Sequence, residues 1–375
     1  MSDSRRVLLV EPYHGGSHAA WADGLVRHSR HRVVTASHEG EFWRWRMRGG
    51  SLTLAEAAEQ VVAKHGRPEV VLVSGMVDLA AWLGFSRRFL GDPAVVLYLH
   101  ENQLVYPLGP GQRPDEGLQI ANWTSMAVAD EVWCNSTYQR DSLFRALPAL
   151  LSRAPDNSHA HRLEEVRDTC RVVPVGVELS DIPTRGPTHD EGPPLVLWNH
   201  RWDYDKNPQA VFRSLTKLAE EGVDFRLAIA GENTRVDPRE FTEACLLLGD
   251  RVVQVGYLSR LAYTELLGQA DVVVSAARHE FFGIAVVEAI AGGAVPVLPC
   301  RLSYPELIAE RYQAVALYPD GGLTTRLREV LEDLGRWRSQ VAGLAETMRR
   351  FDWSVLIDDY DTRLENLAAH AQLST

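Results

Sequence analysis

The sequence predicts an α/β protein of two domains, each built on a doubly wound parallel sheet. Short runs of Val, Leu and Ile recur along the 375 residues, and a stretch with helical periodicity follows each of them. Because these runs do not alternate apolar with polar residues, they suit strands covered on both faces, and their alternation with helices predicts βαβ units. A Pro- and Gly-rich segment at 181–194 separates two series of runs and has the composition of an interdomain linker.

The two series place the expected strands in order along the chain. In the first domain they fall at 7–10, 33–35, 70–73, 95–99, 132–135 and 172–175. In the second domain they fall at 195–198, 225–230, 252–255, 272–275, 295–298 and 315–317. Residues 353–369 form an amphipathic pattern, typical of a helix that packs back across the hinge. The sequence therefore predicts Rossmann-like domains at 1–182 and 195–352, a linker at 183–194 and a closing helical segment at 353–375.

Composition places the chain among folded globular proteins. With 45% hydrophobic and 24% charged residues, disordered and fibrous classes are excluded. The four cysteines are far apart and form no Cys-x-x-Cys pair, so neither a disulfide framework nor a structural zinc site is indicated. No apolar segment near the start is long enough for a signal peptide or a membrane span, and we expect a cytoplasmic protein.

Net charge is distributed unevenly along the chain. Of the total of −11, −9 falls in residues 181–375 and −2 in residues 1–180. The second half is therefore a poor candidate for contact with a polyanion.

The segment 279–293 predicts an anion site. It follows the expected strand 272–275 and has the pattern of a turn and then a helix that begins near Gly283. Free N–H groups and the dipole at a helix start attract anions, and a glycine lets the backbone come close. Glu280 lies in the turn, whereas Glu288 lies among apolar helix residues, where an unpaired carboxylate is costly. The structural alternatives are that Glu288 pairs with a buried Arg and that Glu280 only charges the helix start.

The segment LWNHRWDYDKNP, residues 197–208, brings two cations to the end of the first strand of the second domain. Arg201 and Lys206 can stabilise the negative charge that builds on a leaving diphosphate without a metal ion. A solvated charge cluster with Asp203 and Asp205 is the alternative. These two aspartates also imitate a metal-binding Asp-x-Asp, but they lie beside two cations, so we expect neither a metal nor another cofactor.

Two segments of the first domain follow expected strands. In EPYHGGSH, residues 11–18, Gly15 and Gly16 permit positive φ and close backbone approach. The spacing is not Gly-x-Gly-x-x-Gly, so a dehydrogenase is not favoured. In YLHENQ, His100 ends the fourth strand with Asn102 behind it, although a histidine at a strand end is often structural.

The segment FWRWRMR, residues 42–48, interleaves aromatic and basic side chains. Arginine can pair with phosphates and tryptophan can stack on a base, which favours RNA contact. Six of the arginines lie between residues 27 and 48, against two glutamates. The same alternation also fits a strand with one aromatic and one charged face. The candidate RNA contacts are Trp43, Arg44, Trp45, Arg46 and Arg48.

The motifs at 279–293 and 197–208 resemble the nucleotide-sugar signature of retaining glycosyltransferases of the GT-B fold. The resemblance implies that Glu280 contacts hydroxyls of the donor sugar and that Glu288 binds the nucleotide ribose. It places Arg201, Lys206 and the backbone N–H groups of Phe282 and Gly283 on the diphosphate. In the first domain it places Gly15, Gly16 and His18 in the cleft near the donor phosphates and the acceptor, and His100 near the transferred sugar.

A narrower resemblance rests on six strings in order: EPYHGGSH, FWRWRMR, SGMVDLA, YLHENQLVYP, LWNHRWDYDKNP and ARHEFFGIAVVEA. Together they are similar to the tRNA-queuosine α-mannosyltransferase family. That family implies retaining transfer of mannose from GDP-mannose, bound by the second domain, to queuosine in the anticodon region of a tRNA, bound by the first. It also suggests Asp78, in SGMVDLA, and Asn135 as cleft residues. We expect Asp78 and Asn102 on the acceptor side. The alternatives are a lipid or small-molecule acceptor, a nucleotide-sugar epimerase and a non-catalytic nucleotide-sugar or RNA-binding protein.

Overall fold

The computed structural model describes residues 4–109, 113–183, 192–233 and 238–373, so most of the expected linker at 183–194 lies outside the described residues. The chain divides into two compact units. The N-terminal unit consists of Met1–Val177 together with Trp353–Thr375, and the C-terminal unit is Glu178–Asp352. No helix within the described ranges is both long and apolar enough to cross a bilayer.

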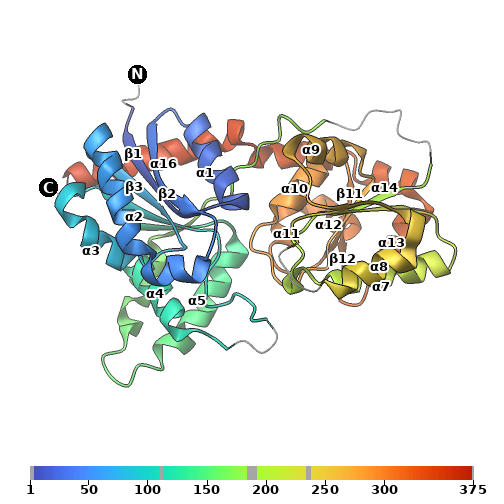
Figure 1. Cartoon of the computed structure of the whole chain (residues 1–375), viewed down its shortest axis with the longest axis horizontal. Coiled ribbons are helices and arrows are strands. Elements are labelled where there is room, and N and C mark those ends of the chain that lie inside the picture. Colours follow the sequence, from blue (N-terminus) through green and yellow to red (C-terminus); the bar gives the residue numbers. More distant parts are fainter. Residues whose placement is uncertain (1–3, 110–112, 184–191, 234–237, 374–375) are drawn as a thin grey trace. The chain divides into compact units, whose positions relative to one another are not determined.

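The N-terminal unit is built on six parallel strands in the order β2-β1-β3-β4-β5-β6 (Figure 1). The strands are β1 (Arg6–His14), β2 (Arg32–Glu39), β3 (Val70–Ser74), β4 (Ala94–Leu99), β5 (Glu131–Cys134) and β6 (Cys170–Val172). The last strand was expected at 172–175 and lies earlier in the chain. Pro174 has no N–H with which to continue the ladder.

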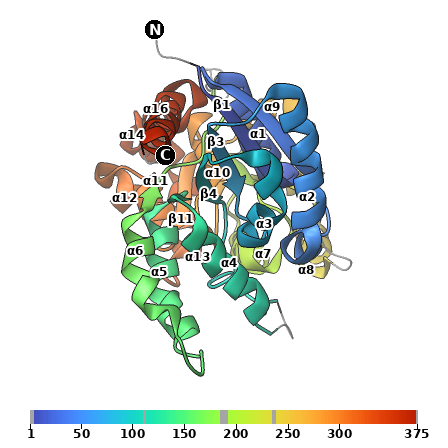
Figure 2. The same ribbon diagram turned by 90° about the vertical axis from the view of Figure 1, so that its left-hand side faces the viewer.

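Helices connect these strands and cover both faces of the sheet. They are α1 (Gly16–His28), α2 (Trp43–His65), α3 (Leu79–Leu90), α4 (Glu116–Val128), α5 (Thr137–Leu151), the 3-10 helix η1 (His159–Arg162), α6 (Leu163–Asp168) and α16 (Trp353–Leu373). Apolar residues of α2 to α6 form one continuous core with alternate residues of the strands. Figure 2 shows α5 and α6 side by side in this unit.

The segment at 42–48 is not a strand. Phe42 caps α2 and residues 43–48 form its first turns. The aromatic and basic side chains therefore do not lie on opposite faces of a sheet. Met47 is buried and forms a small core with Met76 and Leu118, against which Trp43 packs. The strand interpretation was wrong because alternation over a few residues does not distinguish a strand from the start of a helix whose packing is tertiary.

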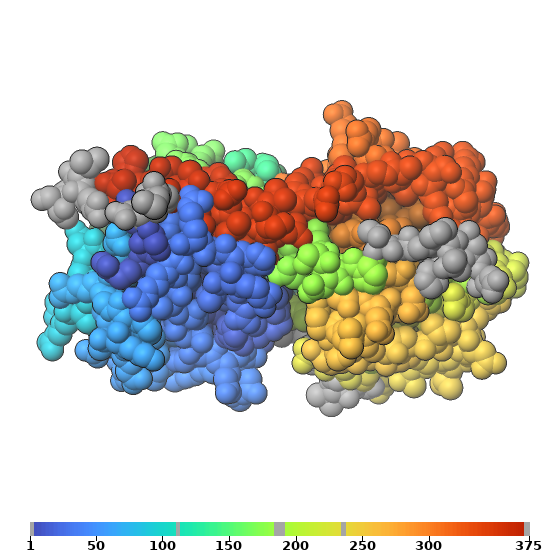
Figure 3. Space-filling view, turned by 90° about the horizontal axis from the view of Figure 1, so that it is seen from above, coloured from blue at the N-terminus to red at the C-terminus, as the bar shows by residue number. Residues whose placement is uncertain are grey.

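Helix α16 closes the other face of the N-terminal sheet, next to α1 (Figure 3). Trp21 of α1 stacks on Tyr98 of β4, with ring centroids 4.6 Å apart. The Trp21 indole N–H donates to the Tyr360 hydroxyl at 3.2 Å, and that hydroxyl donates to the Pro174 carbonyl at 2.7 Å. Asp361 accepts hydrogen bonds from Ser29 Oγ and from the backbone N–H of Arg30. The last helix in the sequence is therefore an integral part of the first unit.

The C-terminal unit also contains six parallel strands, in the order β12-β11-β10-β7-β8-β9. They are β7 (Leu195–Trp198), β8 (Arg226–Ala230), β9 (Val252–Gly256), β10 (Val272–Val274), β11 (Val295–Pro299) and β12 (Leu317–Tyr318). The strand expected at 315–317 is mostly the end of a helix, because a short apolar run fits a buried helix equally well.

Helices again cover both faces in the C-terminal unit, with α9 and α10 on one side and α7, α8 and α13 on the other (Figure 1). The helices are α7 (Pro208–Glu220), α8 (Arg239–Leu248), α9 (Arg260–Gln269), α10 (Ile284–Ala291), α11 (Tyr304–Leu307), α12 (Glu310–Ala316), α13 (Leu323–Glu332), α14 (Leu334–Gln340) and α15 (Leu344–Met348). Three 3-10 helices complete the described part of the unit: η2 (Tyr204–Lys206), η3 (Gly249–Arg251) and η4 (Arg349–Phe351). These elements confirm the predicted α/β class with two doubly wound sheets.

The contact between α1 and α16 gives a direct test of this packing. A Cβ on Gly24 of α1 would lie 2.0 Å from Trp353 Nε1, whereas a Cβ on Gly84 of α3 would meet no atom within 4 Å. We expect Gly24→Ala to destabilise the fold by about 1–3 kcal/mol through overpacking. The same substitution at Gly84 should stabilise it by about 0.5–1 kcal/mol, since alanine is the better helix former. Urea denaturation would measure both, and equal shifts in the two variants would contradict this account of α16.

Candidate functional site

The Lys206 side chain joins the two motifs of the C-terminal unit. Lys206 ends η2, in the loop that follows β7, and Glu280 follows β10, the neighbouring strand. The Lys206 ammonium lies 3.0 Å from Glu280 Oε2, 3.0 Å from the His279 carbonyl oxygen and 3.3 Å from Asp205 Oδ2. Only 9% of Lys206 is exposed, which excludes the solvated-cluster alternative for this residue. Burial opposes its charge, but Glu280 and Asp205 outweigh burial and raise the pKa of Lys206 above its ordinary value.

Two buried histidines flank this lysine. Burial first, and the charge of Lys206 second, lower the pKa of His200 to about 3 and that of His279 to about 4. Both imidazoles are therefore neutral near pH 7. Arg201 lies exposed in the same loop and is close enough for its charge to oppose that of Lys206. The fixed positive charge of this site therefore comes from Lys206 and Arg201.

Asp203 and Asp205 are engaged within the loop. Asp203 Oδ1 accepts a hydrogen bond from the backbone N–H of Tyr204 and so caps η2. Asp205 is 1% exposed and contacts the Lys206 ammonium. Burial, followed by the charge of Asp205, raises the pKa of Asp203.

Helix α10 begins beside Glu280. Gly283 caps the helix with φ +106°, a conformation that an L side chain rarely adopts. A Cβ at Gly283 would lie 3.6 Å from Glu280 Cγ, so the glutamate side chain lies next to the helix start. Ser303 Oγ donates to the Phe282 carbonyl at 2.9 Å and fixes the turn. The first turn of α10 thus has the free N–H groups that attract an anion.

Glu288 lies in α10 and has the arginine partner that its apolar surroundings require. Arg260 Nη1, from the first turn of α9, lies 2.5 Å from Glu288 Oε1, and the Tyr263 hydroxyl donates to Oε2 at 3.2 Å. Burial raises the pKa of Glu288 even though Arg260 opposes the shift. Asn199 donates to the Tyr263 hydroxyl at 2.9 Å. The sequence analysis missed Arg260 and Tyr263. The available signal was that both follow β9 directly, so they lie at the same edge of the sheet as the start of α10.

In the N-terminal unit, the glycine turn and two histidines meet at one edge of the sheet. Gly16 has φ +53°, and a Cβ on Gly15 would lie 2.9 Å from Gly40 Cα, so both positions require glycine. His18, in the first turn of α1, and His100, after β4, have ring centroids 4.2 Å apart. Burial, and then the nearby His18, lower the pKa of His100 well below its ordinary value. His100 is therefore a neutral imidazole near pH 7.

Asp78 and Asn102 have structural partners. Asp78 caps α3 by accepting a hydrogen bond from the backbone N–H of Ala81 at 3.0 Å. Asn102 is 1% exposed, and its carbonyl oxygen accepts from the backbone N–H of Val105 at 3.2 Å. An acceptor-side role for Asp78 and Asn102 stays a prediction. In the structure, each side chain hydrogen-bonds a backbone N–H three residues further along the chain.

The basic segment at the start of α2 presents part of its side chains to solvent. Trp45 is 62% exposed, and Arg44 and Arg48 are exposed one helical turn apart. Arg48 forms an ion pair with Asp115, and the Arg44 guanidinium lies over the Trp43 ring at 4.9 Å from its centroid. Arg46 is partly buried, as is Trp43. The exposed candidates for RNA contact are therefore Arg44, Trp45 and Arg48.

Comparison of this chain with known proteins bears on both units. Residues 6–177 match the family described as tRNA-queuosine alpha-mannosyltransferase N-terminal, and residues 184–340 match glycosyl transferases group 1. The chain is 33% identical over 310 residues to a tRNA-queuosine alpha-mannosyltransferase of Drosophila melanogaster, covering 80% of this chain and 81% of that protein. It is 24% identical over 303 residues to a GDP-mannose-dependent alpha-(1-6)-phosphatidylinositol dimannoside mannosyltransferase of Mycobacterium tuberculosis, covering 78% and 73%.

Solved structures share the architecture. Sucrose-phosphate synthase from Thermosynechococcus elongatus superimposes with a TM-score of 0.73 at 16% identity, covering 98% of this chain and all of that one. HepE from Anabaena, solved in complex with UDP-glucose, gives a TM-score of 0.70 at 15% identity, covering 96% of this chain and 100% of that one. These likenesses establish the GT-B fold. With the identity to the fly protein across both units, they show that this chain is a glycosyltransferase and belongs to the tRNA-queuosine alpha-mannosyltransferase family.

Proposed function

We propose that this protein transfers mannose from GDP-mannose to queuosine in the anticodon region of a tRNA, with retention of anomeric configuration. The observation that carries the donor half is the contact of the buried Lys206 with Glu280 beside the start of α10. Family membership supports the acceptor half, because the match to the queuosine family covers the N-terminal unit.

In the proposed donor complex, the diphosphate lies against the first turn of α10, Lys206 and Arg201. Negative charge grows on the leaving diphosphate as the sugar–phosphate bond breaks, and preorganised cations lower that barrier without reorganising. Glu280 holds the Lys206 ammonium in place and turns its own carboxylate toward hydroxyls of the sugar. Asp205 is occupied by Lys206, so the proposed donor site uses no divalent ion on the diphosphate.

In this proposal Glu288 binds the nucleotide ribose. Its existing contacts limit which lone pairs of the carboxylate can accept a ribose hydroxyl. Arg260 and Tyr263 already hydrogen-bond the two carboxylate oxygens, yet each ionised oxygen has a second lone pair available. A ribose hydroxyl can therefore add to the existing network. On the acceptor side, front-face attack would leave the departing phosphate to take the proton of the queuosine hydroxyl.

The reaction itself is the first test. We expect nucleosides from queuosine-containing tRNA, incubated with the protein and GDP-mannose, to gain the mass of one hexose in mass spectrometry. UDP-glucose in place of GDP-mannose, and tRNA with guanosine in place of queuosine, serve as controls and should give no product. Conversion of GDP-mannose without any acceptor would instead indicate an epimerase. Mannosylation of a lipid extract but never of tRNA would overturn the acceptor.

A second test concerns the donor site. Lys206→Ala should lower kcat by about a hundredfold or more, since loss of a preorganised cation at the leaving group costs about 3 kcal/mol. Glu280→Gln should also lower kcat, because a neutral amide no longer provides the charge that holds the Lys206 ammonium. Lys217→Ala, an exposed lysine in the last turn of α7, is the matched control and should leave kcat unchanged. Circular dichroism would establish that the variants fold. Near-normal turnover by either folded variant would remove Lys206 and Glu280 from the donor site.

The third test concerns the RNA surface. Arg44→Ala combined with Arg48→Ala should weaken tRNA binding and reduce its salt dependence, because a protein that neutralises fewer phosphates displaces fewer counterions from the RNA. Donor binding should change little. Arg87→Ala with Arg88→Ala removes the same charge from exposed positions of α3 in the same unit and serves as control. Affinities measured across a salt series would contradict the assignment if both pairs behaved alike.

A further inference from the structure

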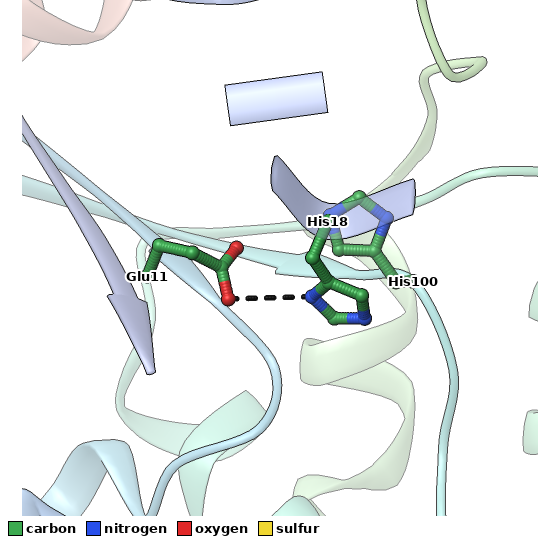
Figure 4. Close-up of side chains that lie close together, drawn as sticks. All are labelled: Glu11, His18 and His100. Carbon is green, nitrogen blue, oxygen red and sulfur yellow. Dashed lines mark hydrogen bonds and ion pairs between the residues drawn. The ribbon is translucent and has the colours of Figure 1, made fainter. Parts of the chain in front are cut away.

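Three side chains with metal-binding atoms meet in the N-terminal unit (Figure 4). Glu11 lies on β1, His18 in the first turn of α1 and His100 directly after β4. Their ligand atoms all lie within 4.8 Å of one another. The Glu11 carboxylate points toward the His18 imidazole, and the His100 ring lies just above the His18 ring in this view. Residues distant in sequence therefore present one carboxylate and two imidazoles to a common point.

The Glu11 carboxylate is fully buried and only partly satisfied. Oε1 accepts a hydrogen bond from the backbone N–H of Tyr13 at 2.9 Å. Oε2 is buried and makes no hydrogen bond within the described chain. Among the described residues, Glu11 forms its ion pair with His18, and neither a lysine nor an arginine pairs with it. A buried carboxylate without a cation carries a large desolvation penalty, so this position calls for positive charge.

The distances suit a metal better than a hydrogen bond. His18 Nδ1 lies 3.3 Å from Glu11 Oε1, which is long for an N–H to carboxylate contact. Two ligand atoms on neighbouring corners of a tetrahedron, each about 2.0–2.1 Å from Zn²⁺, lie about 3.3–3.4 Å apart. His100 Nε2 is buried and makes no hydrogen bond among the described residues. A modest movement of His100 would complete a three-ligand set.

The surroundings supply what orients such ligands. The Tyr13 N–H fixes the carboxylate by donating a hydrogen bond to Glu11 Oε1. Trp21 and Tyr98 pack against the His100 ring, with centroids 4.7 Å away in each case. Asn135 Nδ2 donates to the His100 carbonyl at 2.9 Å. Hydrogen-bonded and apolar neighbours of this kind hold metal ligands in place and exclude water.

We propose that Glu11, His18 and His100 bind one divalent transition-metal ion, with Zn²⁺ as the ion that their donor set favours. Two imidazole nitrogens and one carboxylate oxygen are typical of Zn²⁺ with an open fourth position, whereas Mg²⁺ and Ca²⁺ prefer oxygen ligands throughout. The ion would join β1, α1 and β4 at one edge of the sheet and neutralise Glu11. All three ligands belong to the N-terminal unit.

The test uses the full chain, freed of metal by a chelator and then titrated. Isothermal titration with Zn²⁺ should give one equivalent per chain, and Co²⁺ should produce visible d–d absorption with the same stoichiometry. Glu11→Gln and His100→Ala should each weaken Zn²⁺ binding about a hundredfold or more, since removing a ligand exceeds the roughly 10–100-fold effect of removing a residue that only orients one. His14→Ala is the matched control, because His14 lies on the same strand and pairs with Asp23 outside the cluster.

A thermal measurement keeps the proposal open to failure if a variant folds poorly. Zn²⁺ should raise the unfolding temperature of the parent and of His14→Ala, because a ligand that binds only the native state stabilises it. It should not raise that of Glu11→Gln. Absence of a stoichiometric site in the parent, or equal Zn²⁺ affinity in the parent and Glu11→Gln, would overturn the metal site and leave a Glu11–His18 pair compensated by a proton. Neither readout depends on transferase activity.

Discussion

The arrangement of chemistry in this protein depends on one geometric constraint: parallel strands place all their carboxyl ends at the same edge of a sheet. In the C-terminal unit this brings the loop after β7, which carries Arg201 and Lys206, next to the turn after β10, which carries Glu280. In the N-terminal unit it brings Glu11 near the end of β1 to His100 after β4. The crossover helices place their N-termini at the same edges, so helix dipoles and charged side chains act together there.

Charge burial distinguishes the two edges. In the C-terminal unit the buried Asp205 and the partly buried Glu280 both contact Lys206, and the buried Glu288 contacts Arg260. Such groups are costly to desolvate and are preorganised for a charged ligand once paired. In the N-terminal unit Glu11 is fully buried and is paired with His18 rather than with Lys or Arg among the described residues. The same electrostatic reasoning therefore supports a nucleotide diphosphate at one edge and a metal ion at the other.

Most of the fold could be predicted from the sequence, and the errors have physical causes. Apolar runs bounded by turns located five strands of each sheet closely, because strands inside a parallel sheet are buried on both faces and are therefore apolar throughout. The edge strands β2 and β9 are only partly buried but keep β-branched apolar residues. Two local patterns misled. The alternation at 42–48 belongs to the start of α2, where Met47 packs into a core with Met76 and Leu118. The run at 315–317 ends a helix before β12 begins. In both cases tertiary contacts decided between a helix and a strand that the local pattern fits equally well.

The sequence by itself determined the α/β class, the two sheets and the donor motif, because these depend on periodicity, turn residues and spacings within single βα units. It also indicated that Glu288 needs a polar partner. Only the tertiary structure decided that Arg260 and Tyr263 are the partners, that Lys206 is buried against Glu280, and that α16 completes the first unit rather than the second. The juxtaposition of Glu11, His18 and His100 was likewise invisible, since His100 is far along the chain and reaches the other two only through the strand order β1-β3-β4. Contacts between side chains from different strands are set by sheet topology, which no local stretch of sequence encodes.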